Sequence, residues 1–255
     1  TMEAIPNYFL GEPKIKTLLF QEGEDADYVP GIITGTYDLA VPSISEETLK
    51  AITDGNSNGE LTGDTLTTIL VDYRGYGYLG INADLVNIDG QPGSDESKAL
   101  RKGFMTVLAV YRDTVINSYY GDRASVIQYP ISNTSWAAPQ PADEGYRTAY
   151  SVDAEGNDIY DSSMNDEQKY EAALQAAITF FEKAGYTFAD GKVASAPAGA
   201  PESYEILIPG QGQQDHPAYG IAVAASEALE SIGIKLSVND VGTSVWNNAL
   251  EGNTA

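Results

Sequence analysis

The stretch that decides the fold runs from Glu202 to Gly252 and reads ESYEILIPGQGQQDHPAYGIAVAASEALESIGIKLSVNDVGTSVWNNALEG. Its first apolar run, Tyr204–Pro209, predicts a strand, and the apolar positions of Pro217–Ile232 recur at helical spacing. Gly233 is a typical helix stop, and Ile234–Val238 then alternates apolar and polar residues as a half-buried strand does. A strand, a helix and a second strand in this order predict an α/β unit.

Similar elements are predicted on the N-terminal side of this stretch. Further strands are expected at Ile15–Phe20, Tyr37–Val41, Leu66–Val71 and Tyr76–Asn82. Helices are expected at Ser45–Thr53, Ser94–Tyr119 and Asn165–Ala184, with a last short helix that begins at Val245 and ends at Glu251-Gly252. Ser45 and Asn165 are typical N-cap residues, and Gln168 follows Asn165 at capping-box spacing. Strands interleaved with helices predict a mixed central β-sheet flanked by helices.

Composition excludes several classes of function. The chain has 255 residues, and 14 basic against 37 acidic side chains give a net charge of −23. Such a charge opposes binding to nucleic acid and to anionic membrane surfaces. The absence of cysteine excludes disulfides and thiolate chemistry, and no apolar run is long enough to span a membrane. We therefore expect no nucleic-acid partner and no direct membrane span.

Five motifs together resemble one protein family. The Glu202–Gly252 stretch is similar to its helix, "xxIGIxVxxx" strand and "W…L..G" sequence. Residues 5–20 (IPNYFLGEPKIKTLLF) resemble "NPxYWxGxPxIDxIxF", with Phe9 in place of the usual Trp. Residues 33–43 (ITGTYDLAVPS), 76–82 (YGYLGIN) and, more loosely, 100–126 follow in the family's order. The family is that of the family 5 (oligopeptide and dipeptide) extracellular solute-binding proteins of ABC importers.

The resemblance implies a fold and a function. It implies a periplasmic-binding-protein-like (type II) lobe, with residues 1–255 as a single α/β lobe and an irregular insertion at about 120–164. This lobe corresponds to the second of the family's two lobes, as if cut out of the whole protein. It implies a non-enzymatic, monomeric binding component that takes oligopeptides or similar solutes between two lobes and passes them to an ABC permease. It also implies an extracellular, cell-surface or periplasmic location, with a lipid anchor in the full-length protein.

Position and aromatic content suggest where a ligand would bind. Ligands of open α/β sheets lie outside the carboxyl ends of the strands, which points to Pro42 and Ser43 after one predicted strand and to Gln211 and Gln213 after another. The chain has 17 tyrosines, and aromatic faces suit peptide or sugar binding. The aromatic candidates are Tyr76, Tyr78 and Trp136, of which Trp136 lies in irregular polar sequence. Trp246 is expected in the core.

Other chemistry is weakly indicated. Asp54, Asn56 and Asn58 imitate the start of a calcium loop, but the twelfth position is Thr65 instead of glutamate, so an ordinary loop explains the same residues. The Gly210-Gln-Gly212 turn lacks the third glycine of a dinucleotide fingerprint. The single histidine, His216, stands at a helix start, where a capping or solvated role is expected. No cofactor is predicted.

Two rival functions stay open at this point. One is a cell-surface adhesion or carbohydrate-binding module with tyrosines as the contact surface. The other is a carboxylate-dependent hydrolase, because the acidic residues are numerous enough to contain an acid/base pair. A β-sandwich would contradict the solute-binding interpretation, which requires a sheet flanked by helices.

Overall fold

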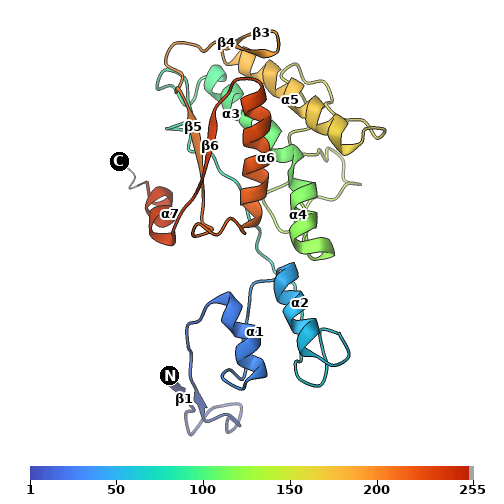
Figure 1. Cartoon of the computed structure of the whole chain (residues 1–255), viewed down its shortest axis with the longest axis vertical. Coiled ribbons are helices and arrows are strands. Elements are labelled where there is room, and N and C mark those ends of the chain that lie inside the picture. Colours follow the sequence, from blue (N-terminus) through green and yellow to red (C-terminus); the bar gives the residue numbers. More distant parts are fainter. Residues whose placement is uncertain (253–255) are drawn as a thin grey trace. The chain divides into compact units, whose positions relative to one another are not determined.

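A computed structural model describes residues 1–252 of the chain. Its contacts group into two compact units, Thr1–Val71 and Asp72–Ala255, which we describe one at a time. Both contain helices and short strands, so the α/β class predicted from the sequence is confirmed (Figure 1).

The first unit is small and lightly packed. A two-stranded antiparallel sheet joins β1 (Met2–Glu3) to β2 (Thr17–Leu18). Helices α1 (Asp25–Ile33) and α2 (Glu46–Gly55) follow. Its buried apolar cluster consists of Val29, Ile52 and Leu66. So small a core predicts that this unit opens more easily than the second.

The second unit holds the main core. Its helices are α3 (Asp95–Val110), α4 (Arg112–Tyr120), the 3₁₀ turn η1 (Gly121–Arg123), α5 (Asp166–Lys183), α6 (Pro217–Ser231) and α7 (Thr243–Leu250). Helix α3 packs along α5, and α6 lies beside the strands β5 (Tyr204–Ile208) and β6 (Leu236–Asp240) (Figure 1). The fully buried side chains include Leu100, Val107, Phe181 and Leu229.

The strands of the second unit form two separate pairs. β5 and β6 run parallel, with Tyr204 opposite Leu236 and Ile208 opposite Asp240. Because α6 connects them, they make a βαβ unit, as the Glu202–Gly252 stretch predicts. β3 (Thr187–Ala189) and β4 (Lys192–Ser195) form an antiparallel hairpin.

The predicted mixed central sheet is not found among residues 1–252, where the strands form three two-stranded sheets instead. Residues 37–41 and 76–82 carry no strand, and residues 66–71 contribute only an isolated bridge, Thr62 to Thr67. Leu39 and Val41 are 80% and 84% exposed, so their apolar side chains are not buried. The alternation of apolar and polar residues is typical of a strand, but a strand forms only where a second strand pairs with its backbone N–H and C=O groups.

The helix predictions agree with the structure more closely than the strand predictions do. Ser45 and Asn165 both cap helices, and Asn165 makes a full capping box with Gln168. The predicted helix Ser94–Tyr119 is divided at Tyr111 into α3 and α4. Helix α1 was not predicted, because Pro30 and Gly31 near its end interrupt the helical pattern. Trp246 is half-buried in α7, which has no buried residue, so its assignment to the core was wrong.

No helix within residues 1–252 is long and apolar enough to cross a membrane.

Candidate functional site

The carboxyl ends of β5 and β6 form the best-defined candidate site. Because the two strands are parallel, they end at the same edge, and the loops that follow them meet there. Gln211 N donates to Val241 O at 3.1 Å and thereby joins the two loops. Ligands of α/β proteins bind outside such an edge.

Asp240, the last residue of β6, organises the loop that follows β5. Its Oδ2 accepts a hydrogen bond from Gln214 N at 2.7 Å, whereas Oδ1 is buried and receives none of normal geometry. Desolvation raises the pKa of Asp240, but the backbone N–H groups of Gln214, Gly212 and Gly210 outweigh it and hold the pKa below its ordinary value. A Cβ at Gly210 would lie 2.7 Å from Oδ1, so only glycine lets the backbone come this close.

This arrangement explains why a glycine-bearing turn before a helix need not bind a phosphate. In dinucleotide-binding loops the backbone N–H groups and the helix N-terminus face a pyrophosphate. Here the carboxylate of Asp240 receives the N–H of Gln214 and lies against Gly210. The protein's own anion therefore takes the place that a phosphate would need.

His216 caps the helix that leaves the loop. Its Nδ1 accepts a hydrogen bond from Ala218 N at 3.2 Å, and Pro217 occupies the first turn of α6. Burial lowers the pKa of His216, although the neighbouring carboxylates Asp215 and Asp240 act in the opposite direction. The neutral ring is the form that can accept this bond, so the capping role expected from the sequence is confirmed.

A pocket of about 620 Å³ lies at this edge. Its lining includes Glu205 and Leu207 of β5, Asn239 of β6, Gln214 of the loop and Tyr219 of α6. Asn239 Nδ2 donates to Glu205 Oε2 at 2.8 Å, which fixes both side chains. The side chains of Gln214 and Tyr219 make no hydrogen bond with the described residues, so they can donate to a ligand and accept from it. The pocket thus combines apolar walls with a few polar groups, as solute sites do.

The sequence prediction names the loop of this site, and both strands, but not the strand residues that line the pocket. Gln211 and Gln213 are exposed and adjoin the pocket-lining residues Gly212 and Gln214. Glu205 and Asn239 were missed, although the alternation of β5 and β6 carried the signal. In the paired register Leu207 faces Asn239, two positions on from Glu205, so these three residues share one face of the strand pair.

None of the other predicted ligand residues is among those that line this pocket. Pro42 and Ser43 belong to the first unit, where Ser43 N donates to Asp25 Oδ1 at 3.3 Å. Tyr76 and Tyr78 lie in the second unit, exposed, with ring centroids 6.4 Å apart. Trp136 is 98% exposed. Among the described residues no hydrogen bond or ring contact joins these aromatic side chains to the Gln211–Gln213 loop, and their role in ligand binding stays a prediction.

The calcium-like loop is a hydrogen-bonded turn in this structure. Asn56 is buried and its Oδ1 accepts from Leu66 N at 2.7 Å, while its Nδ2 donates to Glu60 O at 2.8 Å. Asn58 Oδ1 accepts from Glu60 N, and Asp54 pairs with Lys50. Because N–H groups already engage these oxygens, the hydrogen bonds favour the ordinary loop, and calcium binding remains an untested hypothesis.

The fold is an α/β unit with a pocket at the carboxyl ends of its parallel strands. Comparison with family models gives its family: the model of bacterial extracellular solute-binding proteins, family 5 Middle, matches residues 1–255. The chain belongs to this family, as the five motifs indicated. No curated protein and no solved structure matches the chain at a significant level. Membership implies a type II periplasmic-binding fold, generally without enzymatic activity. It also implies solute binding for an ABC transporter, in the periplasm or at the cell surface.

Proposed function

We propose that this chain is one lobe of a monomeric, lipid-anchored binding protein that takes up oligopeptides or similar solutes and delivers them to an ABC permease. The observation that carries the proposal is the family match over residues 1–255. The proposal involves no catalytic step and no cofactor. Closure of two lobes over a solute would exclude water and strengthen each polar contact.

The pocket at the ends of β5 and β6 supplies suitable contacts. A peptide backbone presents alternating N–H donors and C=O acceptors. Gln214 and Tyr219 offer side chains that can donate and accept, and Leu207 and Val238 supply apolar walls. We assign these residues, with Gln211 and Gln213 at the rim, to peptide binding. Pro42, Ser43, Tyr76, Tyr78 and Trp136 remain proposed contacts, each to be tested by its own alanine variant.

A thermal-shift screen tests the function. The protein, and the full-length protein that contains it, are screened against peptide pools, and a peptide that binds the folded state raises the melting temperature. Tyr219→Phe removes only one hydroxyl and should weaken peptide binding about twofold to tenfold. Tyr73→Phe makes the same change at an exposed site outside the pocket and should leave affinity unaltered. If no peptide pool shifts the full-length protein, peptide transport is wrong.

A further inference from the structure

The pocket at the ends of β5 and β6 has carboxylates in its lining but no basic side chain. The carboxylates belong to Glu205 and Asp240, and none of the described residues that line the pocket is a lysine, an arginine or a histidine. Glu205 makes no ion pair with the described residues. A cleft lined by charges of one sign concentrates ligands of the opposite sign. The pocket therefore favours a cationic group on its ligand.

The sequence around the pocket supplies little positive charge of its own. Lys235 is the only lysine between residues 202 and 252, and there is no arginine. It is exposed and precedes β6, whereas Asp240 ends that strand. The same stretch has seven acidic residues: Glu202, Glu205, Asp215, Glu227, Glu230, Asp240 and Glu251. Since Asp240 already accepts from Gln214 N, Glu205 is the lining carboxylate that remains for a ligand.

Asn239 gives this carboxylate a defined geometry. Its Nδ2 donates to Glu205 Oε2 at 2.8 Å, and the strand register places both side chains on one face of the strand pair. Asn239 Oδ1 and Glu205 Oε1 make no hydrogen bond with the described residues. Two hydrogen-bond acceptors are therefore available on side chains that are bonded to each other. A ligand group that carries only donors fits this pair.

The guanidinium group of arginine has these properties. It is planar and positively charged, and its fork of N–H donors can bond two neighbouring acceptors at once. Leu207 lies on the same strand face as Glu205, about 7 Å along the strand, and Val245 of α7 also lines the pocket. The methylene stem of an arginine can pack on such an apolar wall while its charged head lies at the carboxylate.

We propose that this pocket selects peptides that carry an arginine side chain, and that Glu205 and Asn239 determine this specificity. Glu205 Oε1 would accept from one N–H group of the guanidinium and Asn239 Oδ1 from another, with the stem of the side chain against Leu207. That the arginine belongs to a peptide rests on the proposed function. The guanidinium site itself does not, so the two are tested separately.

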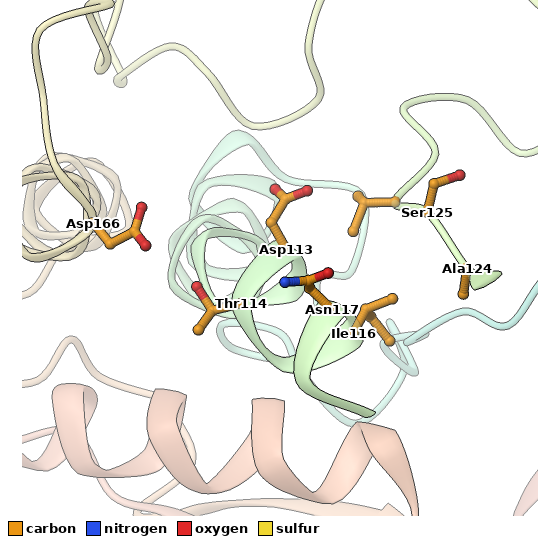
Figure 2. Close-up of a pocket in the computed structure, with 8 residues that line it drawn as sticks. Asp113, Thr114, Ile116, Asn117, Ala124, Ser125 and Asp166 are labelled. Carbon is orange, nitrogen blue, oxygen red and sulfur yellow. The ribbon is translucent and has the colours of Figure 1, made fainter. Parts of the chain in front are cut away.

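A second pocket, of about 430 Å³, supplies the control variant. Asp113 and Asn117 line it from α4, with Asp166 of α5 on one side and Ser125 on the other (Figure 2). Asp113 is exposed, as Glu205 is, and it does not line the pocket at the ends of β5 and β6. Asp113→Asn therefore makes the same charge change as Glu205→Gln at a different place in the same unit.

A free guanidinium tests the site without a peptide. n-Butylguanidinium and its neutral analogue n-butylurea are titrated at constant ionic strength, and the amide NMR shifts of residues 205–207 and 237–241 are followed. We expect saturable shifts with n-butylguanidinium and none with n-butylurea. Glu205→Gln should weaken the binding of n-butylguanidinium about tenfold, because hydrogen bonds to charged groups are the stronger ones, whereas Asp113→Asn should not change it. Melting curves check that each variant is folded.

Peptides test the specificity. Alanine pentapeptides with arginine, citrulline or lysine at the centre are titrated into the full-length protein; citrulline matches arginine in size but has no charge. The arginine peptide should bind about tenfold more tightly than the citrulline peptide, and Glu205→Gln should bring this ratio close to one. Lysine cannot bridge two acceptors with a planar fork, so its peptide should bind about threefold more weakly than the arginine peptide, and Asn239→Ala should remove this difference.

Three results would overturn the proposal. The first is the absence of saturable shifts with n-butylguanidinium. The second is equal affinity for the arginine and citrulline peptides, which would leave the proposed function intact. The third is equal weakening by Glu205→Gln and Asp113→Asn, which would indicate a diffuse effect of charge. If instead no peptide binds but n-butylguanidinium binds and depends on Glu205, the guanidinium site is supported and peptide transport is wrong.

Discussion

Replacing Gly103 with alanine places two effects of known size against each other. Gly103 lies inside α3, and alanine is favoured over glycine within a helix by about 1 kcal/mol. A Cβ at this position, however, would lie 2.8 Å from Cε1 and 2.9 Å from Cζ of Phe181 on α5. Phe181 is fully buried and packs edge-on against Phe104, with ring centroids 5.3 Å apart, so its ring has little room to move.

Packing should prevail over helix propensity in this variant. Forcing a methyl group into a filled core costs about 1–3 kcal/mol, so Gly103→Ala should lower the free energy of unfolding by about 0–2 kcal/mol. Urea denaturation measures the change, with the slope of the transition checked for constancy. Gly77→Ala, at an exposed position where a Cβ meets nothing within 4 Å, is the matched control and should cause no loss.

A double-mutant cycle locates the cause. In the Phe181→Leu background the side chain is smaller, so Gly103→Ala should cost about 1 kcal/mol less than it does in the parent protein. Additive effects of the two substitutions, or a Gly103→Ala protein about 1 kcal/mol more stable than the parent, would refute the reasoning.

Three further outcomes are expected. Asn165→Ala removes the capping box of α5 and should lower stability by about 1 kcal/mol in urea denaturation, whereas Glu171→Gln on the same helix should not. The pKa values of Asp64, Asp153 and Asp161 are lowered by hydrogen bonds from Ser57, Asn157 and Ser163 respectively. These three ionised carboxylates therefore stabilise the folded protein above the ordinary carboxyl pKa, and this stabilisation is lost as the pH falls through the lowered pKa values. In the Asp153→Asn and Asp161→Asn proteins, the stability measured below pH 4 should therefore depend less on pH. Asp240→Ala should lower the melting temperature, and sulfate should partly restore it by binding the freed N–H groups of the loop before α6. No response to sulfate would contradict the interpretation that Asp240 acts as an internal anion.

The parts of the fold that could be predicted from the sequence are those whose signals are local. Asn165 and Gln168 fix the start of α5 by two reciprocal hydrogen bonds, and Gly185 and Gly233, both at positive φ, end their helices. The strands β5 and β6 were also predictable, because one helix joins them and each finds its partner within 30 to 40 residues. In these segments the residues that favour an element and the partners that stabilise it are close in the sequence.

The wrong predictions concern segments whose secondary structure depends on residues far away in the sequence. Residues 76–82 have the tyrosines and alternation of a strand, yet no backbone in the described residues pairs with them. In contrast, the β3–β4 hairpin was overlooked although Asp190 and Gly191, both at positive φ, are a typical two-residue turn. Hydrophobic alternation reports which side chains could be buried, and turn residues report which backbones can pair. In this chain the turn residues are the more informative of the two signals for the β3–β4 hairpin.

The two pockets also differ in how far they could be predicted from the sequence. Gln211 and Gln213 could be placed at a strand end from the sequence, because a parallel pair joined by one helix fixes where its loops lie. The pocket of Asp113, Ser125 and Asp166 could not, since it brings together α4, the segment after η1 and the start of α5, which no sequence period relates. Trp136 was singled out only as an aromatic residue in polar sequence. Asn133, three residues before Trp136, donates to Ser125 at 2.7 Å, and no sequence period predicts this contact between two loop segments either.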